Sequence, residues 1–382
     1  MEAFLDQLNE VVLTLQDFMS GKLLVVLLVG TGLWFTIRLG GVQFTQFGRA
    51  FKSVFGNIKL NGEKAGKDGM TSFQSLATAI AAQVGTGNLA GAATAMVMGG
   101  PGAIFWMWIS AIFGMATIYA EALMAQKYKH VGADGEVTGG PVYYIRAAFK
   151  GGFGKFLAAL FAVLIIFALG FMGNAVQSNS IAASFYTAFG IPQPVMGVIV
   201  AVIALFVFVG GMKRIAKVTE TIVPIIAALY IVGALIVIFY NWRNIPYAFH
   251  AIVVGAFNPA AISGGAVGAT VKLALTKGVA RGLFSNEAGM GSTPHAHAAA
   301  DVKHPCDQGI IAMMGVFIDT FVILTLTALV ILSTGVVGNG LTGSELAQSA
   351  FDAGFGSFGK IFIAICLSLI HISEPTRLGM IS

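Results

Sequence analysis

Three glycines and three polar side chains interrupt one long apolar stretch in the first quarter of the chain. They lie in the run Gln83-Val-Gly-Thr-Gly-Asn-Leu-Ala-Gly91, with Gly85, Thr86 and Asn88 at its centre. Glycine costs roughly 1 kcal/mol relative to alanine in a helix interior, so the run predicts a broken helix. Peptide groups released by a break need partners in apolar surroundings, or they cost several kcal/mol each. Such a break is typical of a site that binds a polar solute.

The break offers ligands for both anions and cations. N–H groups at the start of the outgoing half-helix, over residues 85–88, form a positively polarised nest for an anion. Unwound carbonyls around residues 82–85 are hard oxygen ligands for Na⁺ or an ammonium group, and nearby side-chain oxygens can complete the shell. From this run and the residue before it, we expect the following residues to bind an ion: Ala82, Gly85, Thr86 and Asn88.

The same run matches the G-x-G-x-x-A fingerprint of dinucleotide-binding folds. The match lacks its context, because no strand precedes it and no acidic residue follows about 20 positions later. The sequence also contains no Walker A, zincin or serine-elbow motif. We therefore expect neither an enzyme nor a cofactor.

Composition places the chain in a membrane. Hydrophobic residues make up 57% and charged residues 10% of the 382 positions, and the mean hydropathy is +0.84. Soluble domains carry about 25% charged residues, so we expect an all-α integral membrane protein. The basic residues lie mainly between apolar segments, which is typical of loops that set topology and not of a nucleic-acid-binding surface.

Several segments reach the length of about 20 apolar residues that a membrane span needs. The predicted spans cover residues 21–40, 71–98, 102–126, 153–188, 194–211, 217–240, 258–283, 308–335 and 357–372. Most lysines and arginines fall on one side of these spans, and the acidic start of the chain falls on the other. The positive-inside rule therefore places the N-terminus outside and the basic loops, among which we count Lys277 and Arg281, in the cytoplasm.

Two glycine-rich interruptions occupy matching positions in two groups of spans. After an N-terminal helix and basic segment (1–70), residues 71–240 form a first group of five spans, and residues 241–370 form an incomplete second group. The second group carries the cluster Ser263-Gly-Gly-Ala-Val-Gly-Ala-Thr270. Paired interruptions in two inverted halves indicate a transporter site. The alternative is that both clusters are close-packing notches of the GxxxG kind.

Three motifs resemble one transporter family. The runs Gly85-Thr-Gly-Asn-Leu-Ala-Gly91, Gly139-Gly-Pro-Val-Tyr-Tyr144 and Phe284-Ser-Asn-Glu-Ala-Gly-Met-Gly-Ser292 are similar to those of the alanine or glycine:cation symporter family. The resemblance implies a LeuT-type 5+5 inverted-repeat fold with an extra N-terminal helix. It also implies import of alanine or glycine driven by sodium, or by protons in some members, across the inner membrane of a prokaryotic cell.

Further polar residues are expected to face the substrate. Phe171, Asn174 and Gln177 are spaced by three, which places them nearly on one helical face. Their alternative role is a polar clamp between helices. The full set expected at the substrate is Thr86, Gly87, Asn88, Phe171, Asn174, Gln177, Gly264, Gly265, Gly268 and Thr270.

Acidic residues inside spans are costly and are commonly ion ligands or proton carriers. We expect Asp319 in the eighth span to bind the ion, whereas Glu121 either is functional or lies at the membrane interface near Lys127. In the third motif, Asn286 and Glu287 are candidate gating residues, and a tight cytoplasmic turn is the alternative. His295, His297 and His304 nearby lack ligands at metal spacing, so we expect loop histidines and no metal site.

The end of the sequence departs from the family pattern. After Ile370 the ninth span turns into His371-Ile-Ser-Glu-Pro-Thr-Arg-Leu-Gly-Met-Ile-Ser382, which reads as a non-native tail on a C-terminally truncated second repeat. The expected partners are a small neutral amino acid, Na⁺ and the lipid bilayer. Alternatives are a proton-coupled carrier of another small solute, or a truncated fragment inactive in transport. The sequence leaves the oligomeric state open.

Overall fold

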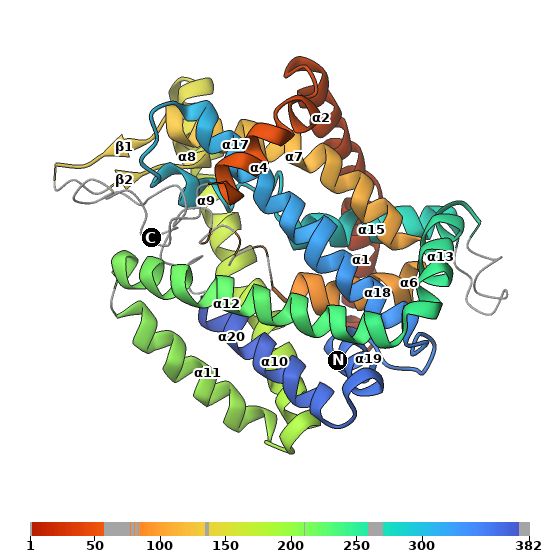
Figure 1. Cartoon of the computed structure of the whole chain (residues 1–382). Coiled ribbons are helices and arrows are strands. Elements are labelled where there is room, and N and C mark those ends of the chain that lie inside the picture. Colours follow the sequence, from red (N-terminus) through yellow and green to blue (C-terminus); the bar gives the residue numbers. More distant parts are fainter. Residues whose placement is uncertain are drawn as a thin grey trace.

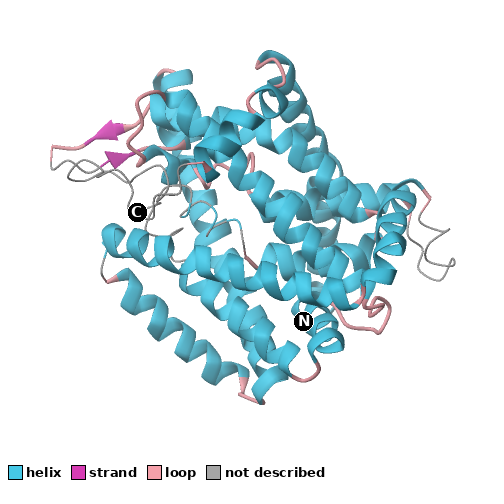
Figure 2. Cartoon of the chain, in the orientation of Figure 1, coloured by secondary structure: helices cyan, strands magenta, loops and turns pink. Residues whose placement is uncertain are grey.

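Helices make up almost all of the structure, a computed structural model that describes residues 2–56, 77, 80, 83, 85–133, 137–209, 211–258 and 270–373. Within this part of the chain the β structure is one antiparallel hairpin of β1 (His130–Val131) and β2 (Val137–Thr138), which projects from the helices in Figure 2. The expectation of an all-α protein is therefore confirmed.

Helix bounds follow chain order. The first half comprises α1 (Glu2–Phe18), η1 (Met19–Leu23), α2 (Leu24–Arg38), α3 (Val42–Thr45), α4 (Phe47–Phe55), η2 (Gly87–Gly91), α6 (Ala92–Gly99), α7 (Ala103–Lys127), α8 (Pro141–Ala148), α9 (Gly151–Ile165), η3 (Ile166–Gly173) and α10 (Asn174–Phe189). The second half comprises α11 (Gln193–Phe208), α12 (Gly211–Tyr240), η4 (Trp242–Asn244), α13 (Ile245–Phe257), α15 (Val271–Asn286), α16 (Pro294–Ala298), α17 (Pro305–Val316), η5 (Phe317–Leu324), α18 (Thr325–Ser333), α19 (Gly343–Phe355) and α20 (Phe358–Ser373).

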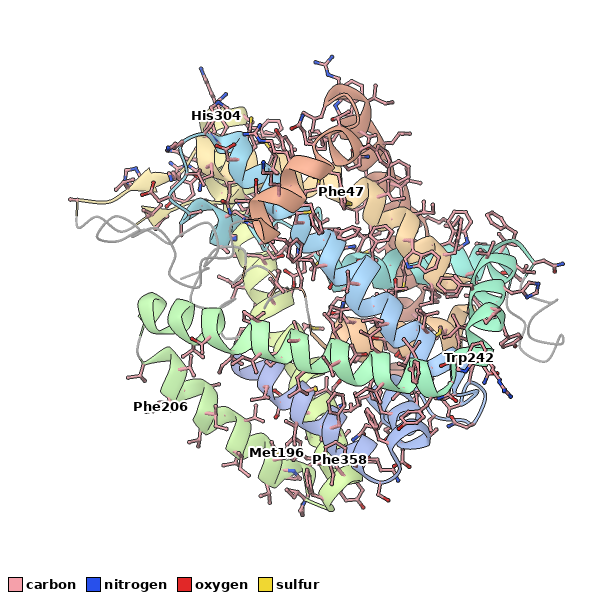
Figure 3. All side chains as sticks on the ribbon, in the orientation of Figure 1. Phe47, Met196, Phe206, Trp242, His304 and Phe358 are labelled. Carbon is pink, nitrogen blue, oxygen red and sulfur yellow. The ribbon has the colours of Figure 1, made fainter. Side chains whose placement is uncertain are left out.

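Five of the described helices are long and apolar enough to cross a membrane, which supports a multi-pass membrane protein. They are Asn9–Arg38, Ala103–Lys127, Gly151–Phe189, Thr221–Tyr240 and Pro305–Ser333, with shorter apolar helices at Gln193–Val207 and Phe358–Leu369. The outer faces agree with a lipid surrounding. Along α11, Val198, Val202 and Phe206 form a stripe with i, i+4 spacing and are each more than 60% exposed. Figure 3 shows Phe206 at the outer edge of the bundle.

The centre of the bundle depends on small residues. The long helix of α17, η5 and α18 runs diagonally through the middle of Figure 1, and α7 packs against both α17 and α15. A Cβ atom on Gly278 of α15 would lie 2.8 Å from Cβ of Trp106 and closer still to the carbonyl oxygen of Ala103, both on α7. Glycine therefore permits a close approach of the two helix backbones. In lipid, where the hydrophobic effect does not drive helices together, such close packing stabilises the bundle.

Four helical segments have π-type hydrogen bonding, and two of them matter for the site. The segments η1, η2, η3 and η5 each lie within or at the start of a longer helix. A π-turn accommodates an extra residue and is often found at functional sites. Here η2 and η5 carry Asn88 and Asp319, respectively.

The region predicted as the seventh span differs from its expected bounds of 258–283. The structure has α13 before it and α15 after it, and the glycine cluster at 264–268 lies outside the described residues. Lys277 and Arg281, counted above as loop residues, lie within α15. At the other end, α20 continues to Ser373, and residues 374–382 lie outside the described part.

A pair of glycine substitutions tests the helix packing. Gly278→Ala is expected to destabilise the protein by about 1–3 kcal/mol, because the added methyl group meets the backbone of α7. A Cβ atom on Gly30 of α2 would meet no atom within 4 Å. Gly30→Ala is therefore expected to be neutral or to stabilise by up to about 1 kcal/mol. Thermal unfolding of the two detergent-solubilised variants measures both, and an equal loss in both would contradict this packing.

Candidate functional site

The predicted break is a tight turn closed by one asparagine. Gly85 forms a bend, and the helix resumes at Thr86 and continues through η2 into α6. The Gly85 N–H donates to Oδ1 of Asn88 at 3.0 Å, and the Asn88 N–H donates to the Gly85 carbonyl oxygen at 3.2 Å. The Asn88 side chain thus satisfies backbone groups that the break has released.

The other end of the same amide joins the break to the long central helix. Nδ2 of Asn88 donates to Oδ1 of Asp319 at 2.7 Å and to the Asp319 carbonyl oxygen at 3.0 Å. Both side chains are fully buried. Two residues that the sequence analysis assigned to the ion site from separate spans are therefore in direct contact.

Hydroxyl groups supply the remaining donors to the Asp319 carboxylate. Oγ of Ser285 lies 3.2 Å from each carboxylate oxygen, and Oγ1 of Thr320 donates to Oδ2 at 2.8 Å. Within the described residues no ion pair reaches Asp319, and its bonded partners are neutral. A buried carboxylate with neutral partners is stabilised by an added cation.

Two buried side-chain oxygens at or next to the break lack hydrogen-bond partners in the described part of the chain. They are Oγ1 of Thr86 and Oε1 of Gln83. Nε2 of Gln83 donates to the carbonyl oxygen of Asn286 at 2.9 Å, so this side chain bridges the break and the end of α15. Gly87 completes the contact, because a Cβ there would lie 2.9 Å from Cα of Ser285. Unpaired buried oxygens are available as ligands for a cation.

A second irregular turn begins one residue beyond the contact of α15 with the break. It follows α15, where Glu287 has a φ of 57° and Gly289 and Gly291 have φ of 90° and 74°. The Gly289 N–H donates to Oε2 of Glu121 at 3.0 Å, and Oγ of Ser292 donates to Oε2 of Glu287 at 2.6 Å. Buried Glu121 therefore supports this turn from α7.

Asn286 ties the second turn to η5. Its Nδ2 lies 3.3 Å from Oγ1 of Thr320, and its Oδ1 accepts the Ala288 N–H at 3.1 Å. The candidate gating residues Asn286 and Glu287 are both buried and lie within two residues of Ser285, a hydrogen-bond partner of Asp319. The predicted counterpart of the first break, at 264–268, lies outside the described residues. In the described structure the end of α15, just before the turn at 287–291, contacts the first break.

Other predicted site residues lie elsewhere. The Phe171 ring is 64% exposed, Nδ2 of Asn174 donates to the Gly170 carbonyl of its own helix, and Thr270 is an exposed N-cap whose hydroxyl accepts the Leu273 N–H. The structure therefore does not bring these three residues to Asp319. Gln177 is buried on α10. Ala82, Gly264, Gly265 and Gly268 lie outside the described residues.

Ser285, Thr320 and Gln83 lie at the site but are not among the site residues predicted from the sequence. Each had a signal nearby, because Ser285 lies in the third motif, Thr320 follows Asp319, and Gln83 opens the polar run. What the sequence lacked was the pairing between elements more than 30 residues apart.

Beyond the second turn, buried polar groups hold the segment around α16. Nε2 of Gln126 donates to the carbonyl oxygens of His297, Ala298 and Ala300, and Nε2 of Gln308 lies 2.8 Å from Nδ1 of His297. Burial lowers the pKa of His297 to about 3. In the described residues no group of three or more His, Cys, Asp or Glu side chains has metal-site geometry.

Comparison with known proteins identifies relatives along almost the whole chain. The model of the sodium:alanine symporter family matches residues 5–377. The chain is 42% identical to an uncharacterized transporter of Haemophilus influenzae, over 97% of this chain and 80% of the relative. It is 41% identical to the sodium/alanine symporter AgcS of Methanococcus maripaludis, over 96% and 80%, and 42% identical to the probable sodium/glutamine symporter GlnT of Bacillus subtilis, over 95% and 73%.

The buried histidine predicts a pH dependence of stability. An exposed imidazole has a pKa of about 6.5, so between this value and about 3 the unfolded chain binds more protons than the folded protein. Stability from this group is present above pH 6.5 and is lost as the pH falls. Between pH 7 and pH 5 the parent is expected to lose about 2 kcal/mol of its free energy of unfolding through this group, and His297→Gln should not show this loss.

Thermal unfolding of detergent-solubilised protein at both pH values measures this effect. The control is His130→Gln, at an exposed position of β1, which should keep the pH dependence of the parent. The same pH dependence in the parent and in His297→Gln would show that His297 is not buried in its neutral form.

Proposed function

The chain belongs to the sodium:alanine symporter family, and we propose that it imports a small neutral amino acid, alanine or glycine, together with Na⁺. Membership makes it an amino-acid transporter of the membrane and not an enzyme. The proposal adds the substrate, the coupling ion and the residues that hold them. The observation that carries it is the buried Asp319 carboxylate with neutral donors at the helix break.

We propose that this carboxylate binds a cation. Na⁺ takes hard oxygen ligands, and Asp319, Thr86 and Gln83 offer buried oxygens around one break. The ammonium group of an amino acid needs the same acceptors. Two positive charges are then to be bound, one on Na⁺ and one on the substrate ammonium group. We propose that oxygens of Asp319, Thr86 and Asn88 bind them, together with the carbonyls of Ala82 and Gly85.

The substrate carboxylate is proposed to lie at the start of the outgoing half-helix. The helix that resumes at Thr86 begins at the break and continues to Gly99, so the positive end of its dipole lies at the site. The close contact of Gly87 with Ser285 leaves little room, which favours a small substrate. Names of relatives include both alanine and glutamine symporters, so competition between substrates has to decide this point.

Alternating access is proposed to use the two adjoining turns. The end of α15, just before the turn at 287–291, contacts the break through Asn286 with Gln83 and through Ser285 with Gly87. We propose that the two turns are the paired interruptions of a five-plus-five inverted repeat with the N-terminus outside. Rotation of one half against the other would break the bonds to Asp319 and Thr320. The bond of Glu121 to Gly289 would then act as a gate closure.

Uptake into proteoliposomes tests the ion site. With an inward Na⁺ gradient, labelled alanine or glycine should accumulate, and replacement of Na⁺ by choline should abolish it. Asp319→Asn is expected to lower the initial rate about 10- to 100-fold, since it removes the charge that neutralises a cation. Thr86→Val should raise the Na⁺ concentration needed for half-maximal uptake.

The matched control is Asp352→Asn, an acid that pairs with Lys360 at the bundle surface and should leave uptake unchanged. Uptake driven by a proton gradient without Na⁺, and lost in Asp319→Asn, would instead assign Asp319 as a proton carrier. Full Na⁺-driven uptake by Asp319→Asn would refute the ion site.

The proposed gate predicts a change in accessibility. Ala288 is 1% exposed beside the Glu121 bond, so Ala288→Cys, in a background with Cys306→Ser and Cys366→Ala, should react slowly with a maleimide. Adding Glu121→Ala removes the acceptor of the Gly289 N–H and should raise the reaction rate about tenfold. Glu345→Ala, at an exposed position of α19, is the control, and equal rates in all three proteins would exclude this gate.

A further inference from the structure

A large cleft separates the N-terminal helix from α15. Its volume is about 940 Å³, and its walls come from α1, η1 and α15, with Met98 at the end of α6. Its apolar lining residues include Phe18, Phe284 and Leu24, the first residue of α2. Many of its other lining residues are polar or charged, so the cleft matches an amphiphilic ligand better than a purely apolar one.

The charges in this cleft are unbalanced. It is lined by four cations and a single carboxylate, which are Lys22, Lys272, Lys277, Arg281 and Asp17. The ion pairs found in the described residues, at Arg49 and Lys360, involve none of them. Lys277 and Arg281 are partly buried, where uncompensated positive charge is costly. The cleft therefore favours an anion.

Two helices independently place the cleft at the level of lipid headgroups. Asp319 lies midway along the continuous helix Pro305–Ser333, which puts the candidate site near the membrane midplane. Along α15, Lys277 lies about 13 Å and Lys272 about 21 Å from Asn286, against a half-thickness of about 15 Å for the hydrocarbon. Arg281 lies deeper, and its long side chain can extend toward the interface.

The length of the N-terminal helix indicates the same depth of the cleft in the membrane. Arg38 lies over the Trp34 ring at 5.6 Å, a pair typical of one membrane interface. A hydrocarbon core of about 30 Å corresponds to about 20 helical residues, so the opposite interface falls near Phe18. Asp17 and Lys22 lie on either side of it.

The cleft is also open to lipid. In the span Asn9–Arg38 only 6% of the most apolar window is buried inside the protein, and Val26 and Leu27 are more than half exposed. The N-terminal helix contacts α15 through η1 and α2. Acyl chains of the bilayer can therefore reach the apolar wall from the side.

We propose that this cleft binds the phosphate headgroup of an anionic glycerophospholipid. The phosphate would lie among Lys272, Lys277 and Arg281, with Lys22 closing the opposite side, and one acyl chain would follow Phe18 and Phe284. Basic pockets between transmembrane helices are a known type of lipid site. Bound there, the lipid links the N-terminal helix to the transport core without touching Asp319.

Thermal unfolding in detergent tests the proposal without reference to transport. Dioleoylphosphatidylglycerol should raise the Tm of the protein by at least about 2 °C more than dioleoylphosphatidylcholine, which has the same chains. In Lys277→Gln/Arg281→Gln, the phosphatidylglycerol concentration for half of this shift should increase about tenfold or more. Lys277→Arg, which keeps the charge, should behave as the parent.

The control Arg146→Gln/Lys155→Gln removes two exposed cations outside the cleft and should leave the lipid effect intact. A shift produced equally by inorganic phosphate would assign a free-anion site and overturn the lipid proposal. Equal shifts with both lipids would also overturn it. A further measurement is the amino-acid KM of Lys277→Gln/Arg281→Gln in vesicles of either lipid. If this KM changes equally in phosphatidylcholine and phosphatidylglycerol vesicles, the cleft belongs to the substrate route and the lipid proposal is overturned.

Discussion

The amide of Asn88 bonded to the carboxylate of Asp319 is the interaction on which the rest of the structure depends. An interrupted helix and a buried acid are each costly in a membrane, and this pair reduces both costs at once. The oxygen of the amide satisfies the backbone of the break, while its nitrogen donates to the acid. Neither irregular element would be stable in lipid at this place without the other.

The surrounding bundle is built to bring these two elements together. Glycines at 87, 278 and 282 allow α15 to approach both η2 and α7, and Ser285 at the end of α15 then reaches the carboxylate. Glu121 on α7 holds the turn that follows. Small residues thus allow short distances between the helices, and these distances let polar side chains form hydrogen bonds from one helix to another. A bundle packed by larger side chains would keep its spans and lose the site.

Local sequence predicted the parts of the site and missed how they pair. The break at 85–88 and the acid at 319 are visible because glycine, amide and carboxylate are rare in apolar spans. The spacing of Phe171, Asn174 and Gln177 showed a shared helical face but not its direction, and the Phe171 ring is on the outside. Before the turn at 287–291, for which the sequence offers gating residues or a tight cytoplasmic turn, Lys277 and Arg281 were expected in a loop but belong to α15. A positive φ at a glutamate has no sequence signal at all.

The π-helical geometry of η5 makes helix length itself part of the binding chemistry. A π-turn carries one residue more than the α-helix around it, and removing that residue would restore regular winding with a rotation of about 100°. Such a shortened chain would still be a stable apolar span between Pro305 and Ser333. Asp319 would then face another helix. The site would be lost through the deletion of one residue, although every residue that forms it would still be present in the sequence.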